Sequence, residues 1–191
     1  MNRTVKLLII PLIFVSIFGW LYFLKTPKQV TLHTNWVNQQ GNLTQALKNS
    51  DLVIIARVNS HYSYSFKGVV FTNHKVTVES NIKSSGDLPS AIEVSQTGGN
   101  YEGTIYNVEK QKPLVDGHTY LFILKKRFPD DKDSLVYTPI GGYQGVIKVQ
   151  GESTTSGKKF VATDFNPDNN LEKEAVNRDI LSELIPKLNT P

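Results

Sequence analysis

Residues 113–126, PLVDGHTYLFILKK, place a turn directly before a dense apolar run that ends at two lysines. Gly117 permits the positive φ of a tight turn, and the chain after it is expected to be extended. Successive side chains of a strand point to opposite faces, so one face carries Tyr120, Phe122 and Leu124 and the other Leu121 and Ile123. A strand that is apolar on both faces is central. We therefore expect a β core on one side of it and the C-terminal helix on the other.

Further strands are predicted on both sides of this one, because short β-branched or alternating runs recur between turn residues. They are DLVIIARV (51–58), VVFTNHKVTVESNIK (69–83), AIEVSQ (91–96), a short strand around 105–108, LVYTPI (135–140) leading into GGYQGVIKVQG (141–151), and KFVAT (159–163). About six or seven short strands with Gly-rich turns favour a mainly β fold, a closed or half-closed antiparallel barrel.

Helices are predicted only at the two ends of this β-rich region. LTQALKN (43–49) suits a short helix, with Asn42 as its N-cap. Asn169 and Glu172 have the spacing of a capping box, and apolar residues recur at helical spacing through 171–188. We expect this amphipathic C-terminal helix to pack on the barrel, and the alternative is a helix that stays free for a partner.

The N-terminal segment has the properties of a membrane anchor. Residues 7–24, LLIIPLIFVSIFGWLYFL, form an uncharged 18-residue block. As a helix this block would be roughly 27 Å long, close to the hydrocarbon thickness of a bilayer. The competing interpretation is a cleaved signal peptide, but the residues that follow are bulky where a small-x-small site is expected. We therefore predict a transmembrane helix that holds the chain in the lipid bilayer.

These features predict a single-pass protein of the cell membrane whose C-terminal domain lies outside the cytoplasm. Residues 1–6 would be a short cytoplasmic N-terminus, 7–24 the transmembrane anchor, 25–42 a linker, and 43–188 an extracytoplasmic β-barrel domain with its C-terminal helix.

Charge and cysteine content exclude several classes of function. Four of the 21 basic residues and none of the 17 acidic ones lie in residues 1–28, so residues 29–191 carry 17 of each. A neutral domain has no broad electrostatic surface for nucleic acid, and we predict no nucleic-acid partner. The chain has no cysteine. A disulfide framework, a thiolate nucleophile and a lipid-modified cysteine are therefore excluded.

The order of these segments resembles a family of poorly characterised bacterial membrane-anchored envelope proteins. It is also similar to netrin-like modules and the tissue inhibitors of metalloproteinases, which are OB-type barrels. The resemblance covers roughly residues 43–150 and is carried by Pro113, Leu114, Gly117, Tyr120, Leu121, Phe122 and Leu124, with Asp51, Gly98, Gly99, Gly142 and Gly145. It implies an OB-like barrel. The inhibitors depend on an amino-terminal cysteine and disulfides, which this chain lacks, and Ser84 stands where other members have glycine.

No catalytic, metal or cofactor site is predicted. His33, His61, His74 and His118 lack the sequence spacing of a metal site, and His74 is interpreted as a partly buried histidine with satisfied hydrogen bonds. PDDKDS (129–134) lacks the glycine of a calcium loop. GESTTSGKK (151–159) departs from the P-loop spacing. We therefore expect a protein that is not an enzyme.

The candidate binding residues lie in HYSYSF (61–66), which we expect to form a loop between the first two strands. Tyr62, Tyr64 and Phe66 fall on one side of an extended segment. OB-type barrels bind ligands through this loop, and exposed aromatic rings stack on sugars or bases. The alternative is that these aromatic residues cover the mouth of the barrel or prolong the hairpin.

The function expected from the sequence is a membrane-tethered extracytoplasmic binding module, with an envelope protein or a cell-wall component as its ligand. The alternative is a netrin-like extracellular protease inhibitor that works without cysteine chelation.

Overall fold

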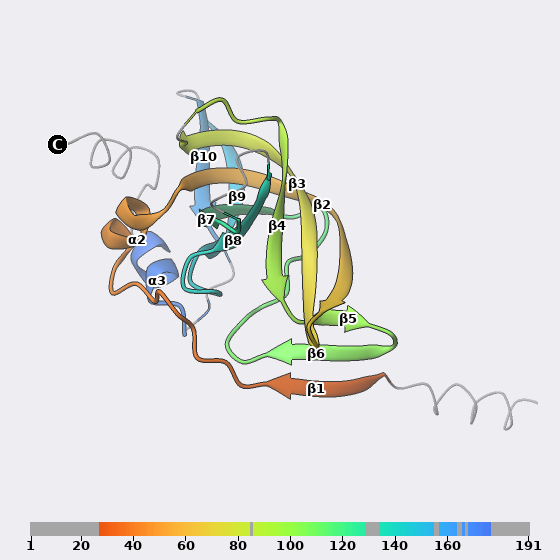
Figure 1. Ribbon diagram of the computed structural model, residues 1–191. Coiled ribbons are helices and arrows are strands. Elements are labelled where there is room, and N and C mark those ends of the chain that lie inside the picture. Colours follow the sequence, from red (N-terminus) through yellow and green to blue (C-terminus); the bar gives the residue numbers. More distant parts are fainter. Residues whose placement is uncertain are drawn as a thin grey trace, which may run out of the picture.

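The computed structural model describes residues 27–84, 86–128, 134–154, 157–163, 166 and 168–176 (Figure 1). Both the anchor predicted for residues 7–24 and the C-terminal helix beyond residue 176 lie outside these ranges. Among the described residues, no helix has the length and apolar character needed to cross a membrane.

The chain is mainly β, as predicted, and most strands belong to one large sheet. The seven strands of this sheet lie in the order β10 (Gly157–Ala162), β9 (Val146–Thr154), β7 (Thr119–Lys126), β2 (Leu52–Phe66), β3 (Val69–Lys83), β4 (Ala91–Thr97) and β8 (Val136–Pro139). The strand of residues 113–126 is therefore central, between β2 and β9.

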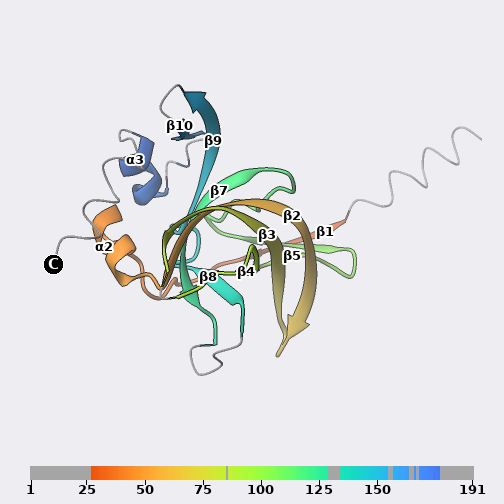
Figure 2. The same ribbon diagram turned by 90° about the horizontal axis from the view of Figure 1, so that it is seen from above.

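The large sheet curls until β8 meets strands from both directions (Figure 2). β8 pairs in parallel with β4 and antiparallel with β7, so β2, β3, β4, β8 and β7 form a ring. The predicted closed or half-closed antiparallel barrel is confirmed only in part, for two reasons besides the parallel β4–β8 pair. The β4–β8 contact covers only the pairs Glu93↔Val136 and Val94↔Tyr137. In addition, β9 and β10 continue the sheet outside the ring, beyond β7.

A second, three-stranded sheet has the order β1 (Lys28–Leu32), β6 (Thr104–Val108) and β5 (Gly99–Tyr101). β1 runs parallel to β6, from Lys28↔Thr104 to Leu32↔Val108. The segment 25–42, predicted as a linker, therefore contains a strand. Its sequence KQVTL has little apolar content, and its partner lies more than seventy residues further along the chain, so no local pattern indicates it.

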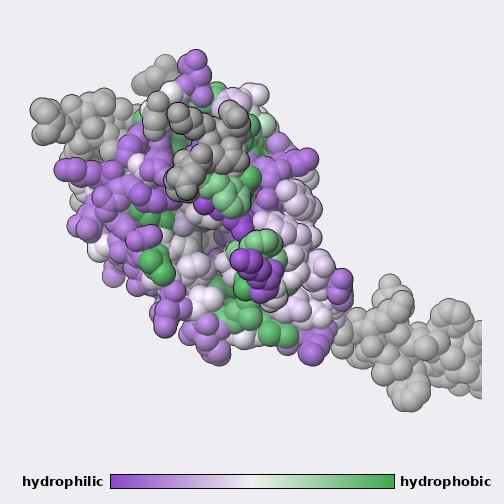
Figure 3. Space-filling view, in the orientation of Figure 1, coloured by the Kyte–Doolittle hydropathy of each residue, from purple (hydrophilic) through white to green (hydrophobic). Residues whose placement is uncertain are grey.

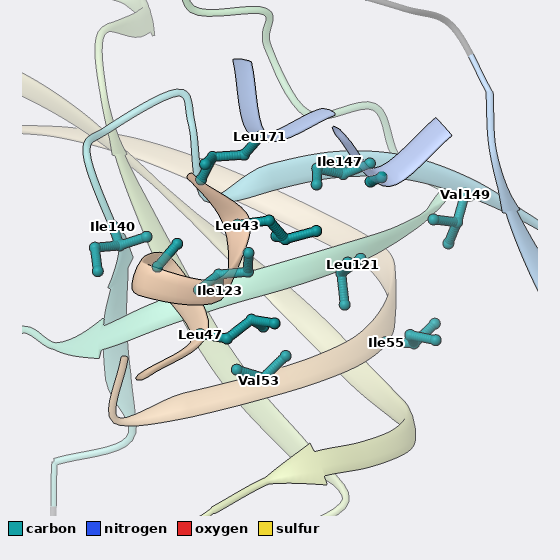
Figure 4. Close-up of a cluster of buried hydrophobic side chains, with 12 residues drawn as sticks. Leu43, Leu47, Val53, Ile55, Leu121, Ile123, Ile140, Ile147, Val149 and Leu171 are labelled. Carbon is teal, nitrogen blue, oxygen red and sulfur yellow. The ribbon is translucent and has the colours of Figure 1, made fainter. Parts of the chain in front are cut away.

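The two faces of β7 contribute to two separate cores, as the alternation of its residues predicts. Tyr120, Phe122 and Leu124 pack inside the ring with residues of β2, β3 and β4. Leu121 and Ile123 pack on the outside, against α2 (Leu43–Asn49) and α3 (Asn170–Val176). Figure 4 shows this outer core, where Leu43 and Leu47 from α2 and Leu171 from α3 lie over the strands.

Both helices begin at the predicted asparagine caps. The Asn42 side chain accepts a hydrogen bond from the Gln45 amide at 2.8 Å. The Asn169 side chain accepts from the Glu172 amide at 3.3 Å. The Glu172 carboxylate reaches further back than in a capping box and accepts from the Asn166 amide at 2.7 Å. The loop before α3 is thus tied to the helix that covers the sheet.

A β-bulge in β2 decides which side chains of the following segment face inward. The pairing changes register between Val58↔Val76 and Ser60↔Lys75, so Asn59 is the extra residue. Before the bulge, even-numbered residues of β2 face the inside of the ring. After it, His61 pairs with the buried His74. Odd-numbered residues therefore continue the inner face, and even-numbered residues turn outward.

Candidate functional site

The segment HYSYSF prolongs the β2–β3 hairpin, which was one of the two alternatives to the loop expected from the sequence. β2 continues through Phe66 and is paired with β3 to the end, where Phe66 lies opposite Val69. The connection is a two-residue turn with positive φ at Lys67 (50°) and Gly68 (80°). Turns with two positive φ values match the twist of paired strands, so the hairpin projects as a regular ribbon.

The three aromatic residues predicted as binding residues share the outer face of this hairpin. Tyr62 and Phe66 are 45% and 57% exposed, and Tyr64 is half-buried between them. The Tyr62 and Tyr64 ring centroids are 6.2 Å apart, and Tyr64 stacks at 5.8 Å on Phe71 of the neighbouring strand. Their rings therefore form a strip that solvent reaches along the prolonged hairpin.

Arg127 completes this strip, although sequence reasoning did not identify it. Its guanidinium carbon lies 4.4 Å from the Phe71 ring centroid and 5.9 Å from that of Tyr64. Its Nη1 donates hydrogen bonds to the Tyr64 hydroxyl at 2.6 Å and to the Ser95 hydroxyl. We call Tyr62, Tyr64, Phe66, Phe71 and Arg127 the aromatic face.

Polar groups border the aromatic face on the side of β4. The Tyr62 hydroxyl donates to the Glu93 carboxylate at 2.9 Å, and the Asn73 amide donates to the same carboxylate oxygen at 2.8 Å. Burial, and to a smaller degree the Glu93 carboxylate, raises the pKa of Tyr62. The aromatic strip therefore has a fixed set of donors and acceptors beside it.

A groove of about 390 Å³ continues from the aromatic face toward the connection after β1. It shares Phe71 and Ser95 with the surroundings of Arg127, and Trp36 and Val37 form its other wall. Val37 is 79% exposed. On the face shown in Figure 3, hydrophobic side chains form separate small patches among hydrophilic ones.

The inner face of the same hairpin holds a second group of polar side chains. His61 and His74 are cross-strand partners, with ring centroids 5.6 Å apart. Asp116, in the turn before β7, has its two carboxylate oxygens 3.0 and 3.1 Å from His61 Nδ1. The sequence did not predict this group, because its members lie on three elements and only the antiparallel register brings them together.

His74 differs from the prediction of a partly buried, satisfied histidine. It is 3% exposed, and no group of the described residues bonds to its Nδ1. Burial and, to a lesser extent, the neighbouring His61 lower the pKa of His74 to about 4, while Asp116 acts in the opposite direction. The imidazole of His74 is therefore neutral at physiological pH.

A cavity of about 250 Å³ opens beside these histidines, between the hairpin and β6. We call it the histidine pocket, and it is lined among others by His61, Ser63, Thr72, His74, Gln96 and Tyr106. Gly99 lies against the Thr72 hydroxyl with a φ of +119°, and a side chain at this position would collide with that hydroxyl. A glycine here is thus required by both the backbone and the packing.

Comparison with known proteins adds no assignment. No family model matches the chain, and no curated protein matches it significantly. The similarity to netrin-like modules therefore stays a prediction.

Proposed function

We propose that this chain is a non-enzymatic binding module, tethered outside the cell membrane, that holds a cell-wall glycan on the aromatic face. The observation that carries the proposal is the strip of partly exposed rings at the end of the β2–β3 hairpin, braced by Arg127.

The strand pairings support an OB-type arrangement. An OB barrel has the ring order 1-2-3-5-4, with strands 3 and 5 parallel. The ring β2-β3-β4-β8-β7 has this order, and its β4–β8 contact is the parallel one. In this comparison β2 and β3 are strands 1 and 2, and β7 and β8 are strands 4 and 5.

The position of the aromatic face fits the ligand site of such barrels. OB domains bind oligosaccharides and oligonucleotides through the loops between strands 1 and 2 and between strands 4 and 5. Tyr64 and Phe66 precede the first of these loops, and Arg127 is the first residue of the second. The tip of the β2–β3 hairpin, the end of β7 and the start of β8 lie on the same side of the molecule (Figure 2).

The chemistry of the aromatic face favours a glycan. Flat, partly exposed rings stack on the apolar faces of sugars, and the adjacent Glu93 and Asn73 side chains can bond hydroxyl groups. The same rings could stack on bases, but residues 29–191 carry 17 basic and 17 acidic residues. A binding site for a nucleic-acid backbone needs an excess of positive charge.

The predicted anchor would keep this face near the wall. Three residues, 25–27, separate the predicted membrane segment 7–24 from the start of β1 at Lys28. Three extended residues span at most about 11 Å. The small sheet would therefore lie close to the outer surface of the bilayer, within reach of envelope polymers.

Retention of the purified full-length chain on insoluble cell-wall material tests the proposal. The double variant Tyr62→Ala with Phe66→Ala removes the two most exposed rings, so we expect at least a tenfold weaker retention at an unchanged unfolding temperature. Tyr101→Ala, which removes a tyrosine at the tip of the β5–β6 hairpin, is the matched control and should bind as the natural chain does.

Two results would contradict the proposal. One is equal retention of the double variant and the natural chain. The other is loss of retention when the wall material has been stripped of protein by protease, since that result would identify a protein ligand.

A further inference from the structure

The inner face of the β2–β3 hairpin brings together three side chains that can bind metal ions. His61 comes from β2, His74 from β3, and Asp116 from the turn before β7. One ligand atom from each lies within 4.8 Å of the others. Metal ligands around one ion are separated by about 3–4 Å, because each lies about 2.0–2.2 Å from the metal. Small side-chain rotations would therefore complete the site.

Backbone contacts hold the three ligands in place. His61 and His74 are fixed by the register of the hairpin, directly after the bulge at Asn59. The turn that carries Asp116 is attached to β2, because the Gly117 amide donates to the Val58 carbonyl at 2.7 Å. The φ of Gly117 is +82°, which favours glycine at this turn. A site on such supports changes little when an ion binds.

The environment of the His74 ring also indicates a metal ligand, independently of the distances within the cluster. Its ring is buried, and its Nδ1 has no hydrogen-bond partner among the described residues. A buried nitrogen without a partner destabilises the fold, and a metal ion bound by this ring would compensate for part of that loss.

We infer that His61, His74 and Asp116 bind one divalent transition-metal ion, with an open coordination position that faces the histidine pocket. Two imidazoles and one carboxylate suit Zn²⁺, Fe²⁺ or Co²⁺ rather than Ca²⁺ or Mg²⁺, which prefer oxygen ligands. Three protein ligands leave room for a water or a small ligand at the metal. This site lies on the face of the hairpin opposite to the aromatic face and does not depend on glycan binding.

The side chains that line the histidine pocket are compatible with an open coordination position on the metal. Both histidines line the histidine pocket, together with the Ser63 and Thr72 hydroxyls, which bond each other at 2.9 Å. Gln96 also lines it, and its Nε2 is buried without a partner among the described residues. A small polar ligand of the metal would find donors on this wall.

Zinc titration of the metal-free full-length chain, in competition with a chromophoric chelator, is the direct test. We expect one Zn²⁺ per chain, unaffected by a thousandfold excess of Ca²⁺. His61→Ala and Asp116→Asn should each weaken binding at least a hundredfold. His33→Ala is the matched control, because His33 also faces a carboxylate, Glu109 at 3.1 Å, but belongs to no three-residue cluster within the described part of the chain. It should leave zinc affinity unchanged.

A second measurement on the natural chain does not depend on the folding of variants. Diethyl pyrocarbonate modifies accessible histidines, and His61, His33 and His118 are exposed while His74 is buried. Zinc should protect His61 and leave His33 and His118 reactive. Three results would overturn the inference: zinc binding that does not saturate at one ion per chain, full zinc affinity in both site variants, or no protection of His61 by zinc.

A spectroscopic measurement tests the open coordination position separately. The Co²⁺-loaded chain should show a visible absorption spectrum that azide shifts, since azide would replace a bound water. A spectrum that azide leaves unchanged would overturn the open position.

Discussion

The guanidinium group of Arg127 stacks on the Phe71 ring, with 4.4 Å between the guanidinium carbon and the ring centroid. This contact joins the residue that follows β7 to the tip region of the β2–β3 hairpin. The hydrogen bond from Arg127 to the Tyr64 hydroxyl reinforces it at 2.6 Å. The exposed rings of Tyr62 and Phe66 are therefore presented on a braced support, which lowers the entropy lost when a ligand binds.

Arg127→Lys should weaken glycan binding while the net charge stays the same. Lysine has no planar group that can stack on the Phe71 ring. We expect a loss of about 1–2 kcal/mol in the free energy of unfolding, with weaker retention on wall material. Urea unfolding measures the first effect, and Arg57→Lys, at an exposed position of β2, is the control. Equal behaviour of the two variants would contradict the bracing role of Arg127.

Gly142→Ala should be far more destabilising than Gly68→Ala. Both glycines have positive φ, 66° and 80°, so both substitutions strain the backbone by about 1 kcal/mol. A Cβ at position 142 would also overlap the Trp36 ring, whereas a Cβ at position 68 meets nothing within 4 Å. We expect a total of about 3 kcal/mol for Gly142→Ala. Thermal unfolding of the two variants separates strain from packing, and similar losses would show that Trp36 does not pack on Gly142.

Acid should destabilise the metal-free chain through His74. The pKa of His74 is lowered to about 4 in the folded chain from 6.5, so between these values the unfolded chain binds more protons. Folding stability therefore rises with pH, and the contribution is lost as the pH falls from about 6.5 to about 4. A shift of this size corresponds to about 3 kcal/mol.

The comparison that isolates His74 is urea unfolding of the natural chain and His74→Gln at pH 7 and pH 4, with a chelator present. Glutamine does not titrate, so the variant should lose less stability between the two pH values. Identical losses would mean that His74 is protonated as easily in the folded chain as in the unfolded one.

Asn169→Ala should cost more than Asn42→Ala, although both residues cap helices. Asn42 is exposed, so its loss should destabilise the chain by about 1 kcal/mol. Asn169 is 1% exposed, and its Nδ2 also donates to the carbonyls of Tyr143 and Gln144 at 3.3 Å. Leaving these buried groups without a partner should raise the cost to about 2–3 kcal/mol. Chemical denaturation of both variants measures the difference, which would vanish if Asn169 only caps α3.

Local sequence patterns predicted the strands and helix caps well, because these features depend on neighbouring residues. The alternation of apolar residues in 119–126 indicates both cores, and Asn42 and Asn169 indicate where the helices begin. β1 was missed because its polar sequence is stabilised by pairing with β6. The local sequence of a strand does not indicate which distant strand it pairs with.

The candidate sites were predictable only in part, for the same reason. Side chains alternate between the two faces of a strand, so the sequence predicts that Tyr62, Tyr64 and Phe66 share one face. The bulge at Asn59 decides that this face is the outer one. Arg127 and Asp116 come from segments more than fifty residues away, so their contacts with the hairpin need the ring of strands to form.

Photo-crosslinking in intact cells tests the central claim most directly, with Phe66→p-benzoylphenylalanine and the control Asp87→p-benzoylphenylalanine in the full-length chain. Asp87 lies in the turn between β3 and β4, at the opposite end of β3 from the hairpin tip. The account predicts that position 66 captures cell-wall glycan, seen as a species that a wall-digesting glycosidase trims, and that position 87 does not. Capture of protein alone at position 66, or equal capture of glycan at both positions, would contradict it.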